Sequence, residues 1–166
     1  MSTNASTSLN NRNSLVRSIV LGGIIIGTLH LIIQDLVVFS LLYNNPFISV
    51  LQYLASGALG NAAFEGGLAI ALLGVFFHFL VSFVVAAVFI LSADRIPLLR
   101  RYVIVGSLLY GIGVFIVMNF IVLPLSAAPS LPAPTPFQLI ELIIEHALVI
   151  GLPLGILIRR NANIKK

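Results

Sequence analysis

The sequence contains no cysteine, which excludes disulfide bonds and metal sites built on thiolates. It is also poor in charge, since only 8% of its 166 residues are Asp, Glu, Lys or Arg. Soluble domains carry charge on roughly a quarter of their residues, so this composition excludes an ordinary soluble domain. Hydrophobic residues make up 59% of the chain, and the mean hydropathy is +1.12. The sequence therefore predicts an integral membrane protein.

Four long apolar runs follow one another along the chain. They cover about residues 18–43, 67–91, 102–125 and 137–158. About 20 apolar residues are enough for a helix to cross the hydrocarbon core of a bilayer. We therefore expect an all-α integral membrane fold, in which one membrane domain (residues 18–158) forms an antiparallel four-transmembrane-helix bundle.

Basic residues are absent from two of the three connections between these runs, residues 44–66 and 126–136. All nine lie near the termini or in the middle connection: Arg12, Arg17, Arg95, Arg100, Arg101, Arg159, Arg160, Lys165 and Lys166. By the positive-inside rule, both termini and the middle connection are cytoplasmic in a multi-pass membrane protein. This distribution accounts for the isoelectric point of about 10.0 without nucleic acid as a partner.

The segments outside the runs have distinct compositions. The Ser- and Asn-rich residues 1–17 predict a disordered cytoplasmic N-terminus, and residues 159–166 form a basic cytoplasmic tail. In the first outer connection, the stretch NPFISVLQYLASG repeats apolar residues at helical spacing after Pro46, which predicts a short interfacial helix. Pro153, inside the fourth run, predicts a bend in that helix.

Each run also contains a pair of small residues four positions apart, in the half nearer the cytoplasm. Such pairs allow two helix backbones to approach closely in lipid, so we expect them at helix-packing contacts. The pairs are Gly23 and Gly27, Ser82 and Ala86, Ser107 and Gly111, and Gly151 and Gly155. Aligning Arg17 with Arg101 pairs some of these small residues and indicates a parallel internal repeat. The apolar composition that the two halves share explains the same similarity equally well.

Polar side chains inside the runs are the candidates for function, because a charge in mid-membrane costs about 2.5–3.5 kcal/mol. In the fourth run, the stretch ELIIEHALVI places Glu141 and Glu145 one helical turn apart, with His146 next in sequence. Counted from the outer ends of the runs, the carboxylates lie shallower than the histidines. We expect a polar cleft that opens outward and is lined by Asp35, His78, Asn119, Glu141, Glu145, His146 and His30.

Four strings carry a family resemblance: ASGALGNAAFEGG, LGVFFHF, YGIGVFIVMNFIVLPLS and EHALVIGLPLG. They resemble an uncharacterised family of small four-helix bacterial inner-membrane proteins, and a looser similarity to YagU-type membrane proteins begins at His78. The resemblance implies a bacterial inner-membrane location and four helices, and it brings no reaction with it. Members of the family have Asp where this chain has His30, which favours His78, Asn119 and His146 as the functional side chains.

Three interpretations of the polar residues remain open. In the first, the carboxylates attract a proton, a cation or a small polar solute, which binds in the cleft or passes through it, while the histidines accept protons near neutral pH. Alternating access through four short helices would require dimerisation, so a homo-oligomer accompanies that interpretation. In the second, the chain is a non-catalytic membrane scaffold or assembly factor, whose polar residues only join helices by hydrogen bonds.

The third interpretation is a haem or metal site, because histidines on facing helices are the usual ligands for iron in a bundle. The Glu-x-x-His spacing of di-iron bundles is absent, and the adjacent Glu145 and His146 are expected to point about 100° apart on a helix. Neither G-x-S-x-G nor H-E-x-x-H occurs, so enzymatic activity is not expected and no catalytic residue is assigned. The cofactor is left unknown, and the expected partners are the lipid bilayer and a small polar solute or cation.

Overall fold

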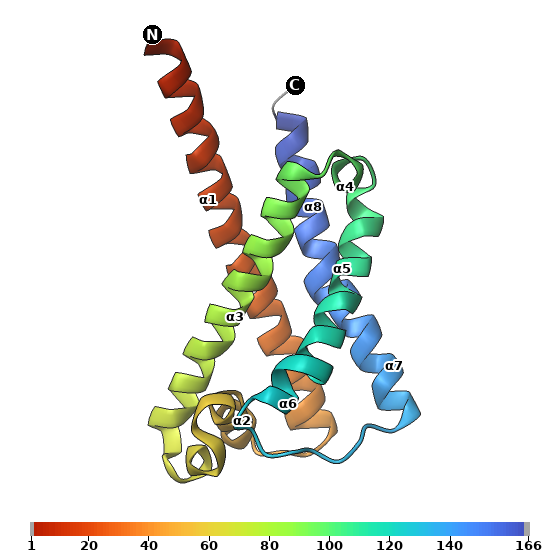
Figure 1. Cartoon of the computed structure of the whole chain (residues 1–166). Helices are drawn as coiled ribbons and strands as arrows, with labels where there is room; N and C mark the ends of the chain where they lie inside the picture. The colour runs from red at the N-terminus through yellow and green to blue at the C-terminus, as the bar shows by residue number, and fades with distance from the viewer. Residues whose placement is uncertain (1, 165–166) are drawn as a thin grey trace.

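The computed structural model describes the backbone of residues 2–164 and the side chains of residues 13–160, and within this part the chain is helical with no strand (Figure 1). The elements are α1 (Ser2–His30), η1 (Leu31–Leu42), α2 (Phe47–Leu59), η2 (Gly60–Glu65), α3 (Gly67–Arg95), α4 (Pro97–Arg101), α5 (Val103–Val117), η3 (Met118–Val122), α6 (Leu123–Leu125), α7 (Pro136–Glu145), η4 (His146–Gly151) and α8 (Leu152–Ile164). The α1–η1, α5–η3–α6 and α7–η4–α8 segments are each one continuous helix.

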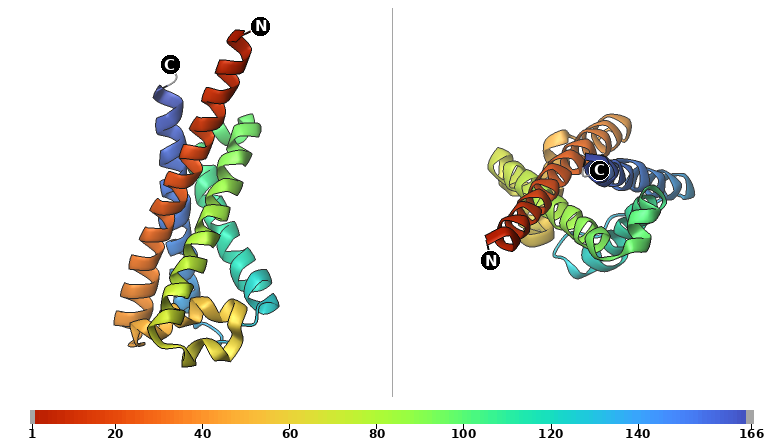
Figure 2. Two further views of the ribbon diagram at one scale, coloured as in Figure 1. Left: turned by 90° about the vertical axis from the view of Figure 1, so that its left-hand side faces the viewer. Right: turned by 90° about the horizontal axis from the view of Figure 1, so that it is seen from above.

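Five helical segments are long and apolar enough to cross a membrane: Asn13–Leu42, Phe47–Glu65, Gly67–Arg95, Val103–Leu125 and Pro136–Arg160. Their outward faces carry many exposed Leu, Ile, Val and Phe side chains, which is the surface that lipid covers in a membrane protein. The helices therefore suggest a multi-pass membrane protein. Four of the segments coincide with the predicted spans, and the fifth combines α2 and η2. Figure 2 shows α2 lying across one end of the bundle, while the other four run along it.

Most of the predicted N-terminal tail and of the basic tail falls in residues 1–12 and 161–166. The side chains of those residues lie outside the described part of the chain. The end of the predicted disordered segment, residues 13–17, is instead helical and belongs to α1. The helix continues through it because Leu15 packs against the apolar core and because Ser18 Oγ donates a hydrogen bond to the Ser14 carbonyl.

Glycines let the long helices approach one another closely. A Cβ built on Gly23 of α1 would lie 2.1 Å from Cδ1 of Phe83 on α3, and one built on Gly27 would lie 2.8 Å from Cδ1 of Phe79. On the other side of the bundle, a Cβ on Gly111 of α5 would lie 2.3 Å from the His146 carbonyl oxygen. These positions have no room for a side chain, so the small residues set the separations of α1 from α3 and of α5 from η4.

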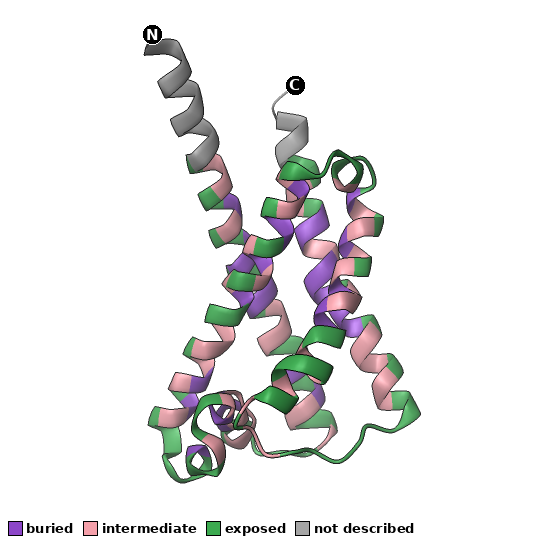
Figure 3. Cartoon of the chain, in the orientation of Figure 1, coloured by how far each residue is buried: buried purple, intermediate pink, exposed green. Residues whose placement is uncertain are grey.

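The apolar core fills the part of the bundle nearer the two termini. It is built from eight buried side chains: Ile26, Ala86, Phe89, Ile90, Val103, Val114, Ile150 and Leu154. Figure 3 shows the buried residues gathered where α1, α3, α5 and α8 come together. Tyr110 packs against this core, and its hydroxyl donates a hydrogen bond to the Val85 carbonyl at 2.8 Å.

Three stretches of the long helices, η1, η3 and η4, are π-helical. Two of them end just before a proline: η3 ends at Val122, before Pro124, and η4 ends at Gly151, before Pro153. A proline inside a helix cannot donate its backbone hydrogen bond and clashes with the carbonyl four residues earlier, and a widened turn relieves that clash. Pro153 therefore follows a widened stretch of helix that begins at His146 and that relieves the clash of the proline ring.

The glycine contacts predict the stability of two matched variants. Gly111→Ala inserts a methyl group where the His146 carbonyl already lies, so we expect it to lower the free energy of unfolding by about 1–3 kcal/mol. Gly113→Ala, two residues further on the same helix, meets nothing within 4 Å and should leave that free energy nearly unchanged. Thermal unfolding of both variants in detergent, followed by circular dichroism, tests this; equal stabilities would contradict the packing described here.

Candidate functional site

Five ionisable side chains from three of the long helices meet inside the bundle. They are His30 at the end of α1, Asp35 in η1, His78 in α3, Glu145 at the end of α7 and His146 at the start of η4. We call this group the histidine–carboxylate cluster. All three histidines of the chain belong to it.

One side of the cluster joins His30, Asp35 and His78. Oδ2 of Asp35 lies 3.6 Å from Nδ1 of His30 and 3.8 Å from Nδ1 of His78. The opposite ring nitrogen of His78, Nε2, lies 2.9 Å from the carbonyl oxygen of Gly27 and donates its hydrogen to it. That bond fixes the tautomer, so Nδ1 of His78 keeps a free lone pair that faces Asp35.

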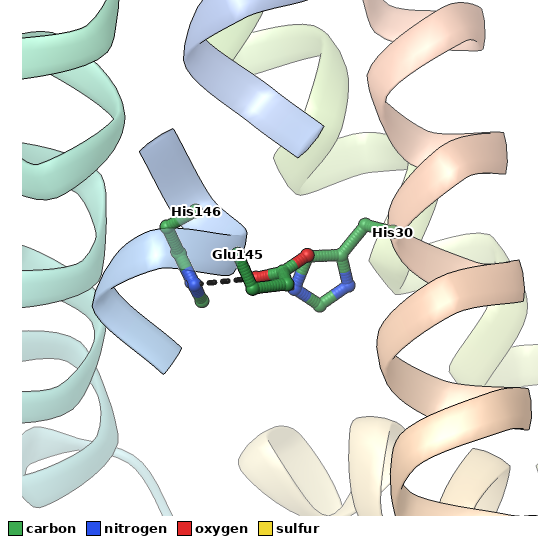
Figure 4. Close-up of side chains that lie close together, drawn as sticks. All are labelled: His30, Glu145 and His146. Carbon is green, nitrogen blue, oxygen red and sulfur yellow. Dashed lines mark ion pairs between the residues drawn. The ribbon is translucent and has the colours of Figure 1, made fainter. Parts of the chain in front are cut away.

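The other side joins His30, Glu145 and His146 (Figure 4). Oε2 of Glu145 lies 3.9 Å from Nε2 of His30 and 2.7 Å from Nδ1 of His146. Nδ1 of His146 also lies 2.9 Å from the Leu142 carbonyl oxygen, one turn earlier in its own helix. In Figure 4 the carboxylate of Glu145 lies between the two imidazole rings.

His30 occupies the centre of the cluster. Its ring centroid lies 5.3 Å from that of His78 and 5.4 Å from that of His146. Because members of the similar family have Asp at this position, the sequence favoured other residues over His30 as functional side chains. In the structure, His30 is the residue that contacts both carboxylates.

The cluster is almost fully shielded from solvent. The exposed fractions are 3% for Asp35, 6% for Glu145, 6% for His146 and 1% for the neighbouring Gln34. Several of these buried polar atoms make no hydrogen bond of good geometry, although Oε2 of Glu145 lies 2.7 Å from Nδ1 of His146: His30 Nδ1, both amide atoms of Gln34, Asp35 Oδ2, Glu141 Oε2 and both carboxylate oxygens of Glu145. Buried polar groups in folded proteins are nearly all hydrogen-bonded, so a concentration of unpaired ones makes this place the candidate binding site of the chain.

The π-helical turns explain why these residues meet. In an α-helix, residues five apart lie about 140° apart around the axis, whereas the π-helix pairs residue i with residue i+5. Because η1 begins directly after His30, Asp35 comes to lie beside it one wide turn later. Helical spacing of 3.6 residues would have paired His30 with Gln34 instead.

The structure also corrects two geometric expectations. Glu145 and His146 were expected to point apart because they are adjacent, but their side chains are in contact. The helix widens into η4 at His146, and the long Glu145 side chain bends back toward the ring. The carboxylates were also expected to lie at a shallower level than the histidines, whereas Asp35 and Glu145 contact the rings directly.

Two predicted cleft residues lie outside the cluster. Asn119 donates its amide hydrogen to the Phe115 carbonyl of its own helix at 3.0 Å. Glu141, one turn before Glu145, lines an open groove of about 410 Å³ between η1 and the α7–η4 helix. Apart from Glu141 and Glu145, the groove is lined by apolar side chains: Ile33, Phe137, Ile140, Ile144, Leu148 and Val149.

Gln34 is a site residue that the sequence-based list of cleft residues omits. Its amide is buried at 1% exposure beside Asp35, and neither its nitrogen nor its oxygen has a partner. Its position four residues after His30 could have identified it, because residues four apart lie on the same face of an α-helix.

The predicted packing pairs border the cluster. Gly27 supplies the carbonyl that holds His78, and a Cβ on Gly27 would lie 3.0 Å from Ser82 Oγ. Gly111 packs on the backbone of His146. Ala86 and Gly23 continue the α1–α3 contact, while Gly151 and Gly155 pack against Ser107.

Comparison of the chain with protein-family models, with curated proteins and with solved structures finds no match. Function is therefore inferred from the geometry of the cluster alone.

Two overlapping sets of side chains in the cluster have the composition and proximity of metal ligands. One set is His30, Glu145 and His146, and the other is His30, Asp35 and His78; within each set the ligand atoms lie within 4.8 Å of one another. Imidazole together with carboxylate suits Zn²⁺, Mn²⁺, iron, nickel and copper, whereas Ca²⁺ and Mg²⁺ prefer ligand sets made entirely of oxygen. Bond lengths of about 2.0–2.2 Å place ligand atoms about 3–3.5 Å apart around an ion, close to the separations around Asp35.

The burial of the Glu145 carboxylate leads to a prediction about the stability of the metal-free protein. Desolvating a buried charge costs several kcal/mol when its interactions do not fully compensate it, and an apolar side chain of similar volume avoids that cost. We expect Glu145→Met to raise the free energy of unfolding of the metal-free protein, because the carboxylate is almost fully buried and its nearest charged or polar side-chain neighbour is the ring of His146. The exposed Glu65 provides the matched control, and Glu65→Met should change that free energy little. Unfolding with EDTA present measures both; a clear loss of stability in Glu145→Met would show that the carboxylate holds the helices together.

Proposed function

We propose that this protein is a multi-pass membrane protein that binds a divalent transition-metal ion inside its helix bundle, at the histidine–carboxylate cluster. The observation that supports this most directly is the convergence of three histidines and two carboxylates on one buried place, with several ligand atoms unpaired. The proposal adopts the third of the sequence-based interpretations, a metal site, instead of the first, in which a proton, cation or small polar solute binds in an outward-opening cleft or passes through it.

Charge balance favours a cation over a purely structural network. Asp35 and Glu145 bring two negative charges into a region without solvent, and burying an unpaired charge is costly. Among the described residues, the Arg–carboxylate ion pair is that of Arg100 with Asp94, and neither carboxylate of the cluster pairs with an Arg. A divalent ion neutralises both carboxylates while all three histidines stay neutral, which is the form in which imidazole binds metals.

The tautomer of His78 supports the same conclusion. Histidine ligands usually donate their second ring N–H to a carbonyl or carboxylate, which orients the ring toward the metal. His78 does this through Gly27, which leaves Nδ1 free on the side of Asp35. Haem fits less well, because the ring of His30 lies directly against those of His78 and His146 and leaves no plane between them for a porphyrin.

We further propose that four helices span the membrane and that α2 lies in the outer interface. The transverse position of α2 and its contact with α3, where a Cβ on Gly74 would lie 1.9 Å from the Leu51 carbonyl oxygen, support this arrangement (Figure 2). The distribution of Lys and Arg supports cytoplasmic termini, and the resemblance described above supports the inner membrane of a bacterium.

Metal analysis tests the proposed site. Protein purified in detergent without chelators should contain a near-stoichiometric transition metal, and Zn²⁺ or Co²⁺ added to the stripped protein should raise its unfolding temperature. At a free metal concentration of about 100 times the dissociation constant, the expected stabilisation is about 2.7 kcal/mol. Glu145→Gln and His30→Ala should lose most of it, whereas Glu65→Gln should keep it. If the wild type shows neither bound metal nor metal-dependent stabilisation, the chain fits the scaffold interpretation better.

Cysteine labelling tests the orientation, since the natural chain has no cysteine to interfere. We expect Ala133→Cys, in the connection between α6 and α7, to react with a membrane-impermeant maleimide added to intact cells. Leu98→Cys, in α4 between α3 and α5, should react only after the cells are broken. The reverse pattern would invert the topology proposed here.

A further inference from the structure

The two ring nitrogens of His30 face two different carboxylates. Nδ1 lies 3.6 Å from Oδ2 of Asp35, and Nε2 lies 3.9 Å from Oε2 of Glu145. Each carboxylate is in turn close to its own second histidine: Asp35 to His78 at 3.8 Å, and Glu145 to His146 at 2.7 Å. His30 is the member that the two ligand sets share.

Resting on the metal site proposed above, we infer that the cluster holds two transition-metal ions bridged by the imidazolate of His30. The first ion binds Nδ1 of His30, Asp35 and Nδ1 of His78. The second binds Nε2 of His30, Glu145 and one ring nitrogen of His146. Because the two nitrogens of an imidazole point away from each other, a single ion cannot use both, and the two ligand sets describe two separate positions.

The first position is the better formed of the two. Its separations of 3.6 and 3.8 Å around Asp35 Oδ2 leave space for an ion after small shifts, and Nδ1 of His78 is held free by the bond to Gly27. In the second position, Nδ1 of His146 lies 2.7 Å from Glu145 and 2.9 Å from the Leu142 carbonyl oxygen, which accepts its hydrogen, so an ion at Nδ1 has to displace both contacts. The first ion is therefore bound more tightly, and the second completes the bridge.

The proton and charge balance of the bridge is consistent with its surroundings. Neutral His30 carries one N–H; when the second ion binds, that N–H bond breaks, an N–metal bond forms, and the proton passes to water. Two divalent ions bring four positive charges. Asp35, Glu145 and the His30 imidazolate bring three negative charges to the pair. Glu141, one turn before Glu145 on the adjoining groove, brings a fourth, so the bridged pair together with this neighbour is neutral overall.

Copper provides the test, because two Cu²⁺ ions joined by an imidazolate couple magnetically. Stripped full-length protein in detergent is titrated with Cu²⁺ alone, and bound copper is measured by elemental analysis beside the electron paramagnetic resonance signal. We expect the signal to grow with the first equivalent and to fall with the second, while bound copper continues to rise to two ions per chain. His146→Ala should stop at one ion with an ordinary isolated signal, and Glu65→Gln should behave as the wild type.

The outcomes separate the two proposals. Two bound ions with the full signal of isolated copper, or a single ion at saturation in the wild type, would overturn the bridge while leaving the proposed metal binding intact. No bound copper, zinc or cobalt at all would overturn both. The decisive readout is made on the wild type, so it does not depend on whether a variant folds.

Discussion

The close packing of neighbouring helices at two glycines holds the rest of this structure in place. Gly27 lets α1 and α3 touch, and its carbonyl oxygen then lies 2.9 Å from Nε2 of His78. Gly111 lets α5 touch η4 at the backbone of His146. In lipid there is little hydrophobic force between helices, so close packing and interhelical hydrogen bonds supply the association. The contacts that assemble the bundle are therefore the same contacts that orient two of its three histidines.

The interior that these contacts create is unfavourable for charge. Asp35 and Glu145 are nearly fully buried, and their oxygens lack the hydrogen bonds that buried carboxylates usually accept. A fold selected only for stability would place apolar side chains there. Local violations of the packing rules are typical of functional sites, where the compensating interaction comes from a ligand. In the proposed site a divalent cation supplies that interaction, because it satisfies charge and ligand geometry together.

The wide helical turns link the fold to the site. π-Helical turns occur often at functional sites, and here η1 begins after His30 while η4 begins at His146. At η4 the cause lies in the sequence, since Pro153 disfavours regular hydrogen bonding in the turn before it. At η1 no proline lies within the turn, and the described residues give no local cause for the widening. Gln34 and Asp35 are buried in that stretch, so its register is adapted to the neighbouring helices.

The sequence by itself determined the helical class, the four long apolar segments and the small residues at which the helices meet. These follow from composition and spacing, because a helix in lipid satisfies its own backbone and needs only length, apolar surface and small contact residues. The sequence also provided every ionisable member of the cluster. Only the tertiary structure decided that Asp35 lies beside His30, that Glu145 contacts His146 and that Asn119 stays apart. Those outcomes depend on turns that depart from 3.6 residues and on the rotation of one helix against another, and neither is encoded in the spacing of residues along a single segment.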